Sequence, residues 1–176
     1  QSDIAQYLTV LPGVVFTGDQ GGQLYIRGGS PVQNRILLDG MTIYNPFHSI
    51  GFFSVFETEL IRNVDVLTGG FNAEHGGRIS AIVDVKTREG NRKRLSGMTS
   101  IGPFQAKAII EGPIVPLKTD NGSSISFVLA GKRALISDLD DKLYPNINDS
   151  IGIPFKYRDY YGKLSCTYII SQNPRL

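Results

Sequence analysis

The chain has 176 residues, which is enough for one sizeable core or for one domain and part of another. Its 18 basic and 16 acidic residues give a net charge of +2, and this balance argues against nucleic acid or polybasic membrane attachment. Twenty glycines and the absence of tryptophan favour loop-rich β structure over helical bundles.

Cysteine and targeting signals are sparse in this sequence. The single Cys166 excludes an internal disulfide. No run of ~18 apolar residues is present, so the sequence predicts no transmembrane helix. A basic stretch followed by an apolar one, as in a signal peptide, is also missing. Because both ends look abrupt, we expect the chain to be a piece of a longer protein, with its targeting signal upstream.

The first predicted element is a short amphipathic helix. Ser2-Asp3 offers an N-cap, and Pro12-Gly13 ends the helix. Its apolar residues recur at the i, i+3, i+4 and i+7 spacing, which predicts that they pack in a core. These residues are Ile4, Tyr7, Leu8 and Leu11. A glycine-rich loop over residues 17–22 follows, and we expect it to be exposed.

Residues 23–44 are predicted to form two strands and a turn. Leu24 and Ile26 alternate with more polar neighbours, as in a half-buried strand. A short apolar run then breaks at Asp39-Gly40, ahead of a further apolar stretch. Asp-Gly between β-prone residues predicts a hairpin, because a type I′ turn needs φ > 0 at both central positions. Arg27 is expected to be a buried or paired charge.

An aromatic-rich segment, residues 45–53, follows without a clean helix or strand period. Two interpretations stay open: the aromatic side chains fold under as a local cluster, or they present an apolar binding surface. Ser54 is then expected to cap a short helix. The residues predicted to share one face of that helix are Val55, Phe56, Leu60 and Ile61.

Strand-like patterns continue to residue 86. The first covers residues 62–67, with Val64 and Val66 facing inward, and the second covers residues 79–86. Strands mixed with short helices predict a compact α+β unit in the first half of the chain. The charged, glycine-containing run 88–94 is typical of a solvated linker, so we place a domain boundary there.

The second half shows cleaner alternation of apolar and polar residues. Three segments carry it, near residues 104–111, 124–130 and 159–170. Such patterns are typical of outer-membrane barrels, but half-solvated antiparallel sheets show them too. Tyr160 and Tyr168 share the outward face, at a separation that suits two aromatic girdles. The connection 112–123 is short and 135–155 is long, as in barrels.

The sequence contains no recognisable constellation for catalysis. We find no Ser/His/Asp set, no metal-spaced ligands and no phosphate-binding loop. His48 and His75 each stand alone in a loop, where histidines are usually exposed or hydrogen-bonded. We therefore expect no enzyme activity, no catalytic residue, no metal and no cofactor.

Six pieces, taken in order, resemble the plug of TonB-dependent outer-membrane receptors and the start of their barrel. The pieces are residues 11–14, 24–30, 36–40, 61–66, 69–79 and 111–113. The Gly-Gly-Ser sequence at 28–30 and the stretch 44–53 are most similar to the Bacteroidetes branch. No single piece is specific to this family. The six pieces in this order, over residues 4–113, are specific to it.

The resemblance implies an α+β plug domain, a small mixed sheet with short helices, over residues 1–90. Residues 91–176 would then form about the first three antiparallel strands of a truncated transmembrane β-barrel, with one long extracellular loop near 135–155. The protein would lie in the bacterial outer membrane with the plug inside the barrel lumen. It would import a large nutrient (siderophore, vitamin, glycan or peptide) with energy transduced by TonB.

The resemblance also implies partners and site residues. TonB would bind through a box upstream of residue 1, the rest of the barrel and outer-membrane lipid would surround the plug, and a surface lipoprotein is a further candidate. Plug–barrel ion pairs would involve Arg27, Glu74 and Arg78. Substrate-contact loops would present Asp19, Gln20, Asn45, Phe47, His48, Phe52 and Phe53. The alternative is a non-transporting, β-rich outer-membrane or cell-surface adhesion module.

Overall fold

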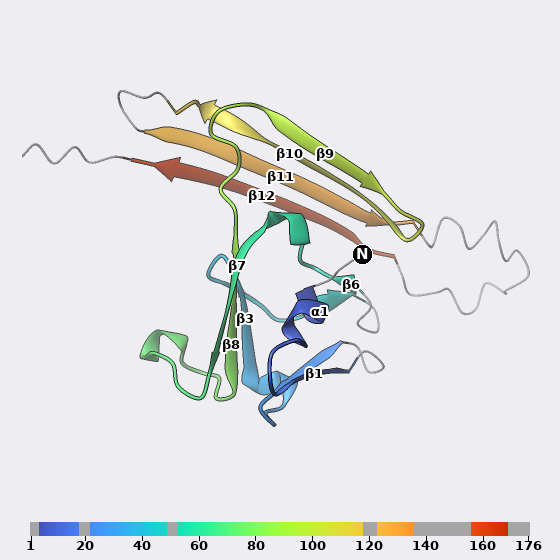
Figure 1. The fold of residues 1–176 in the computed structure, drawn as a ribbon, viewed down its shortest axis with the longest axis vertical. Coiled ribbons are helices and arrows are strands. Elements are labelled where there is room, and N and C mark those ends of the chain that lie inside the picture. Colours follow the sequence, from blue (N-terminus) through green and yellow to red (C-terminus); the bar gives the residue numbers. More distant parts are fainter. Residues whose placement is uncertain (1–3, 18–21, 49–52, 118–122, 136–155, 169–176) are drawn as a thin grey trace, which may run out of the picture. The chain divides into compact units, whose positions relative to one another are not determined.

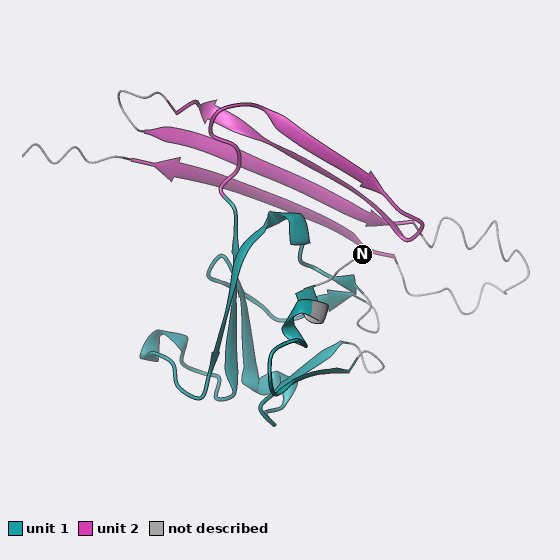
Figure 2. Ribbon diagram, in the orientation of Figure 1, with its two compact units in different colours: residues 1–88 teal, residues 89–176 magenta. Residues whose placement is uncertain are grey.

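The computed structural model describes residues 4–17, 22–48, 53–117, 123–135 and 156–168. The chain divides into two compact units, residues 1–88 and residues 89–176 (Figures 1 and 2). Within the described ranges strands predominate, and the only α-helix is the five-residue α1, Ile4–Leu8. The expected β-rich composition is therefore confirmed.

Unit 1 is built on a mixed four-stranded sheet. Its strands are β1 (Val14–Thr17), β2 (Gln23–Ile26), β3 (Asn34–Leu38), β4 (Met41–Ile43), β5 (Phe47–His48), β6 (Phe53–Ser54), β7 (Ile61–Thr68) and β8 (Ala81–Thr87). The large sheet has the order β4-β3-β8-β7, and β1-β2 and β5-β6 form separate antiparallel pairs. At its centre β3 and β8 run parallel, with Asn34 opposite Ala81 and Leu38 opposite Val85. This pairing joins two distant segments of unit 1 in one sheet.

The predicted hairpin at Asp39-Gly40 is confirmed. Leu38 lies opposite Met41, and the two turn residues have φ angles of +49° and +85°, as a type I′ turn requires. The Asp39 carboxylate also fixes the end of β8: Oδ1 accepts the Thr87 N–H at 3.0 Å and Oδ2 accepts the Thr87 hydroxyl at 2.5 Å. One short turn thus orders both a hairpin and the last strand of the unit.

The core of unit 1 lies between the large sheet and the β1-β2 pair with α1. The alternation predicted around Leu24 and Ile26 is confirmed, since both side chains are buried and their neighbours in β2 are half-buried. Val64 and Val66 pack against the core, as predicted for β7. The buried residues of this core are Ile4, Leu8, Val14, Leu24, Ile26, Phe47, Phe56, Ala81, Val83 and Val85.

The first helix is shorter than predicted. It ends at Leu8, and a turn with a hydrogen bond from Leu11 N–H to Leu8 O follows directly. Ile4 and Leu8 are buried, whereas Tyr7 is 62% exposed and Leu11 40% exposed. The predicted four-residue apolar face is therefore wrong for Tyr7 and Leu11: Tyr7 lies in the helix but is exposed, and Leu11 lies beyond the end of the helix at Leu8. The predicted cap residues lie outside the described residues.

The helix predicted to begin at Ser54 is wrong. Ser54 belongs to β6, and its buried hydroxyl donates to Phe56 O at 3.5 Å. Only a 3-10 turn, η3 (Thr58–Leu60), precedes β7. Phe56 and Leu60 are both buried without a helix to align them. Pairing of Ile61 with Thr87 starts β7 at once and leaves no room for a helix.

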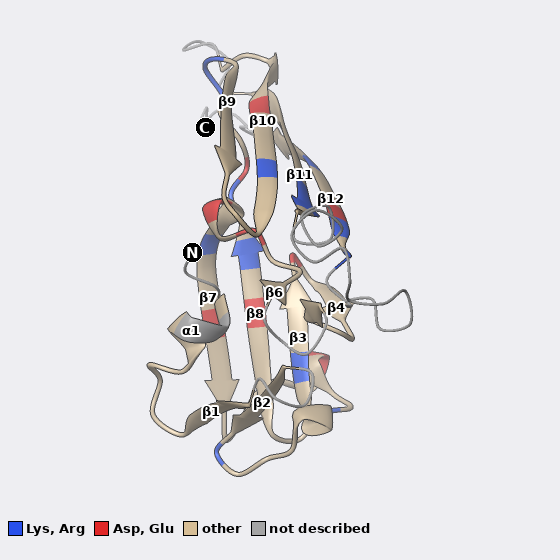
Figure 3. Ribbon diagram, turned by 90° about the vertical axis from the view of Figure 1, so that its right-hand side faces the viewer, with Lys and Arg blue, Asp and Glu red and all other residues tan. Residues whose placement is uncertain are grey.

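Strands β7 and β8 both contain acidic and basic residues (Figure 3). Lys86 Nζ lies 3.1 Å from Asp65 Oδ2 and 3.3 Å from Asp84 Oδ2. The hydrogen bond from Asn63, followed by that from Lys86, lowers the pKa of Asp65. Hydrogen bonds to Asp65 and then to Asp84 raise the pKa of Lys86. The positive charge of Lys86 thus offsets the repulsion between the carboxylates of Asp65 and Asp84, which face each other across the β7-β8 pair.

Unit 2 is a single antiparallel sheet. Its strands are β9 (Ser96–Ile101), β10 (Gln105–Val115), β11 (Ser124–Ala134) and β12 (Arg158–Thr167), in the order β12-β11-β10-β9. The three alternating segments became β10, β11 and β12. The structure adds β9, whose sequence is short and rich in small polar residues, so its own periodicity gave no strand signal.

The two faces of the unit 2 sheet differ in character. Tyr160 is 83% exposed and Tyr168 73% exposed, on the side that also carries Leu129. The opposite side holds the buried Lys107 and Lys132, and Lys132 Nζ lies 3.5 Å from Asp159 Oδ2. The alternation predicted for these strands is confirmed.

Candidate ligand cavity of unit 1

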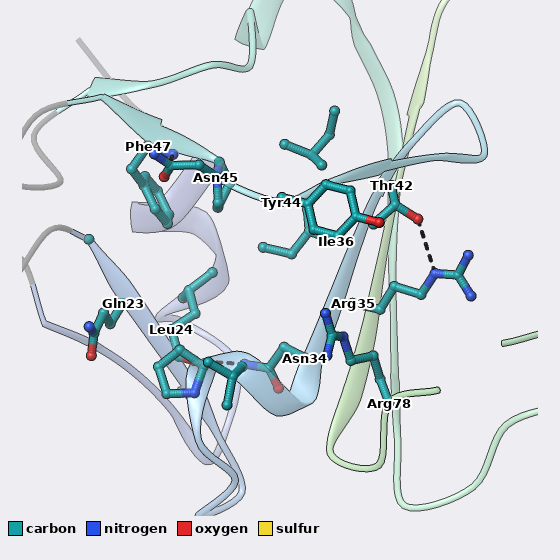
Figure 4. A pocket seen from close by; sticks show the side chains of 15 residues that line it. Gln23, Leu24, Asn34, Arg35, Ile36, Thr42, Tyr44, Asn45, Phe47 and Arg78 are labelled. Carbon is teal, nitrogen blue, oxygen red and sulfur yellow. Dashed lines mark hydrogen bonds between the residues drawn. The ribbon is translucent and has the colours of Figure 1, made fainter. Parts of the chain in front are cut away.

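A cavity of about 410 Å³ opens between β2, the start of β3 and the segment that follows β4 (Figure 4). It also borders the 3-10 turn η1 (Pro31–Gln33). The cavity lies within the size range of small-molecule sites. Its walls are formed by Gly22, Gln23, Leu24, Pro31, Val32, Asn34, Arg35, Ile36, Thr42, Ile43, Tyr44, Asn45, Pro46, Phe47 and Arg78. Two arginines and no acidic residue line it.

The two arginines are held differently. Arg35 Nε donates to Thr42 Oγ1 at 3.3 Å and an Arg35 terminal N–H donates to Gly76 O at 3.4 Å. Figure 4 shows its guanidinium turned toward Thr42, away from the cavity centre. Arg78 is half-buried, and its guanidinium points toward the cavity on the side of Asn34. Within the described ranges Arg78 has no ion pair, so its charge is open to an anion.

Asn34 provides a buried polar wall. The residue is 8% exposed, and its Nδ2 donates to Leu24 O at 2.7 Å, which joins β3 to β2. Its Oδ1 is buried and has no hydrogen-bond partner among the described residues. A buried acceptor left unsatisfied costs roughly 1–3 kcal/mol, so this wall is incomplete as it stands.

Aromatic residues close the other side of the cavity. Tyr44 is 86% exposed and Figure 4 shows its ring across from Arg78. Phe47 is 4% exposed and packs on Phe16 with ring centroids 5.2 Å apart. Asn45 Oδ1 accepts the Phe47 N–H at 3.4 Å, which orders this turn. Phe47 thus belongs both to the core and to the cavity wall.

Arg27 lies apart from this cavity and is exposed. It adopts φ = +48°, an unusual conformation for a residue other than glycine, and its N–H donates to Gly13 O at 2.8 Å. Of the two predicted alternatives, a buried or a paired charge, the buried charge is wrong, because the chain turns at the end of β2 and carries the side chain outward. A paired charge stays a prediction. No ion pair of Arg27 is found in the part of the chain that the structure describes.

Glu74 lies in the 3-10 turn η4 (Ala73–His75), and its side chain is 68% exposed. His75 Nε2 lies 3.6 Å from Glu74 Oε1, an attraction that operates only when the histidine is protonated. Phe71 stacks edge-on with His75 at a centroid distance of 6.5 Å. Glu74 and Arg78 therefore belong to one loop, but only Arg78 lines the cavity.

The remaining predicted contact residues are dispersed. His48 and Phe53 are half-buried and pair across β5 and β6. Asp19, Gln20 and Phe52 lie outside the described residues. The structure thus brings Asn45, Phe47 and Arg78 together, although the sequence placed them in two separate predicted groups.

Sequence reasoning missed Asn34, Arg35 and Tyr44. Asn34 occupies an inward position of β3, in register with Ile36 and Leu38, and a polar residue on an apolar face is a signal that could have been noticed. Arg35 and Tyr44 left no comparable signal, since exposed polar and aromatic residues near turns are common. In the described ranges, no group of His, Cys, Asp and Glu could hold a metal ion. No helix there is long and apolar enough to cross a membrane.

Residues 1–82 match the family model of the TonB-dependent receptor plug domain. The chain is also similar in fold to the siderophore receptor PirA from Acinetobacter baumannii, with a TM-score of 0.56, 22% identity, and 75% of this chain and 22% of that chain covered. For the siderophore receptor PirA from Pseudomonas aeruginosa the TM-score is 0.54 and the identity 18%, with 97% of this chain and 28% of that chain covered. For a mutant of the ferric enterobactin receptor PfeA from Pseudomonas aeruginosa the TM-score is 0.51 and the identity 20%, with 76% of this chain and 22% of that chain covered.

At these identities the likeness concerns the fold, and the chain spans only about a quarter of the length of the receptors it matches. Among curated proteins, none matches the chain. The family match ends at residue 82, inside β8, so it covers nearly all of unit 1. Residues 1–82 are therefore similar in sequence to the plug domain of TonB-dependent receptors, and the chain is similar in fold to the receptors named above.

Proposed function

We propose that the chain is the plug and the first barrel strands of an energy-coupled outer-membrane receptor that imports a large nutrient. The observation that carries this proposal is the match of residues 1–82 to the plug domain. The plug would occupy residues 1–90 and block the pore. Residues 91–176 would begin the barrel, with a long extracellular loop near 135–155.

The two faces of the unit 2 sheet support the barrel assignment. Along β12, exposed residues such as Tyr160 and Leu164 alternate with half-buried polar ones such as Asp159 and Lys163, as they do when one face meets lipid and the other a polar lumen. Tyr160 and Tyr168 lie eight positions apart, which corresponds to roughly 20 Å along the membrane normal for a strand tilted by about 40°. That separation suits two aromatic girdles, and outer-membrane lipid would be their environment.

The partners follow from this role. TonB would pull on the plug through an upstream box, since the outer membrane has no energy source of its own. The rest of the barrel would surround the plug, and a surface lipoprotein is a further candidate partner. Siderophores, vitamins, glycans and peptides are all candidate substrates. The proposal places the protein in the Bacteroidetes branch of the family and gives it no enzyme activity.

The predicted site residues keep their proposed roles. Arg27, Glu74 and Arg78 would contact the barrel wall, and the exposure of Arg27 and Glu74 leaves their charges accessible to it. The residues proposed for substrate contact are Asp19, Gln20, Asn45, Phe47, His48, Phe52 and Phe53.

Growth of a deletion strain tests the transport function. The strain lacks the gene and is supplied with single nutrients from each candidate class, beside a strain that lacks TonB. A receptor predicts that both strains lose growth on the same nutrient and that the intact gene restores it only when TonB is present. An adhesion module predicts unchanged growth on every nutrient and a loss of surface attachment instead.

A further inference from the structure

We propose that the unit 1 cavity is a carboxylate-recognition site in which Arg78 binds the anion. Binding to the chain itself does not depend on the transport function; how the site is used in a complete receptor rests on the proposed function. The carboxylate would belong to a ligand with an apolar or aromatic body, and this role would replace the barrel contact proposed above for Arg78.

The charges of the cavity support an anionic occupant. Arg35 and Arg78 both line it and no Asp or Glu does. Arg35 is already engaged by two neutral acceptors, Thr42 Oγ1 and Gly76 O, and its guanidinium faces away. Arg78 is half-buried without a carboxylate among the described residues. A partly desolvated guanidinium is strongly favoured when a carboxylate pairs with it, because two parallel N–H···O bonds replace lost hydration.

The unsatisfied Oδ1 of Asn34 supplies a second, independent reason. Its Nδ2 is committed to Leu24 O, so Oδ1 can only accept a hydrogen bond. The guanidinium of Arg78 has five N–H donors and points to this side of the cavity. One N–H given to Oδ1 would fix the guanidinium plane and leave its other edge for a carboxylate. Asn34 is thus a positioning residue for Arg78.

The shape of the cavity sets the rest of the occupant. Its volume of about 410 Å³ accommodates a small organic acid. Ile36, Pro31 and Phe47 form apolar walls, and the Tyr44 ring lies across from Arg78. A carboxylate attached to a flat apolar body therefore matches the cavity better than a neutral, fully hydroxylated ligand would.

The test compares benzoate with benzamide, which have nearly the same shape and differ in charge. Each is titrated into the 176-residue chain and followed by ligand-observed NMR. A hydrogen bond to a charged group predicts that benzoate binds about ten- to a hundredfold more tightly than benzamide. Arg78→Gln should reduce this preference to near one. Arg62→Gln removes the same charge from an exposed position on β7 outside the cavity and should leave the preference unchanged.

Two further variants test the roles of Arg78 and Asn34 separately. Arg78→Lys preserves the charge but not the planar fork, so the preference should fall partway, even if Arg78→Gln does not fold. Asn34→Leu should lower the preference for benzoate while benzamide binding stays the same, a change that loss of packing alone would not produce. Equal affinity for the two probes in the parent chain, or an unchanged preference in both Arg78 variants, would overturn the proposal.

The complete receptor, purified in detergent, then distinguishes a ligand from an acidic side chain of the receptor as the source of the carboxylate. Benzoate binding in both the chain and the receptor assigns the site to a ligand. Binding in the chain alone would overturn the ligand site, because an acidic side chain of the receptor would then fill the cavity and pair with Arg78. If the chain binds benzoate but growth never depends on TonB, the site stands and the transport function fails.

Discussion

Replacing Asp39 with alanine should destabilise unit 1 more than any surface substitution. The change removes two hydrogen bonds from Thr87 to a carboxylate, at 3.0 and 2.5 Å. Each bond to a charged group contributes roughly 1.5–3 kcal/mol, and the low end applies because Asp39 is half-buried, which gives about 3 kcal/mol for the pair. Alanine held at positive φ adds about 1 kcal/mol. The expected loss in the free energy of unfolding is about 4 kcal/mol.

Asp39→Asn is the matched control for the backbone conformation. Asparagine tolerates φ > 0 and keeps an oxygen that can accept the Thr87 N–H, so its expected cost is only about 1 kcal/mol. Urea unfolding of the 176-residue chain, followed by far-UV circular dichroism, measures both. At a slope of about 2 kcal/mol per molar urea, alanine should lower the midpoint by about 2 M and asparagine by about 0.5 M.

Amide exchange at Thr87 adds a local readout, because its N–H loses its acceptor only in the alanine variant. The reasoning is refuted if alanine costs less than about 1 kcal/mol, or if asparagine costs as much as alanine. Either result would mean that the carboxylate does not fix the end of β8.

Three further changes test other parts of unit 1. Gly29→Ala should destabilise the fold strongly, because its Cβ would lie 1.9 Å from Ser80 Oγ and 2.4 Å from Ser80 Cβ, and adding Ser80→Gly should restore stability in a thermal melt. Lys86→Met should raise the pKa of Asp65 toward its ordinary value in an NMR titration, since the lysine hydrogen bond helps to lower it. Arg27→Glu in the complete receptor should impair uptake and plug retention if this exposed charge meets a carboxylate of the barrel wall.

Each of these predictions has a clear contrary outcome. A rescue by Ser80→Gly that fails would place the strain at Gly29 in the backbone rather than in the side-chain contact. The depressed pKa of Asp65 contributes stability above the ordinary pKa of the carboxyl, which is lost as pH falls through the lowered value. An unchanged Asp65 titration after Lys86→Met would leave Asn63 as its sole cause. Unchanged uptake and retention after Arg27→Glu would remove Arg27 from the barrel contacts.

Local chemistry explains which parts of the fold could be predicted from the sequence. The turn at Asp39-Gly40 is specified by two adjacent residues, and the inward side chains of β2 and β7 by their alternation. The prediction of a helix from Ser54 failed because the spacing of Phe56 and Leu60 fits two arrangements. One is a helix that buries both side chains on one face, and the other is an irregular chain that buries each of them separately. Spacing records which residues are buried, but it does not distinguish these two routes.

The cavity was harder to predict because its parts come from distant segments. Asn45 and Phe47 follow β4, whereas Arg78 precedes β8, and only the parallel pairing of β3 with β8 brings them to one place. Register between segments that far apart is set by tertiary packing rather than by local propensity. Asn34 was detectable in principle, since a buried amide on an apolar strand face is uncommon.

The position of β8 affects how unit 1 can fold. It is the last strand of unit 1 to leave the ribosome, yet it lies between β3 and β7 in the middle of the sheet. Until β8 has emerged, β3 and β7 lack the strand that joins them, so we expect the four-stranded sheet to form only after residue 87 has been made. A chain ended at residue 82, where the family match stops, would keep Ala81 and lose Val83 and Val85 from the core. The end of the family match thus falls within β8, one of the two central strands of the sheet.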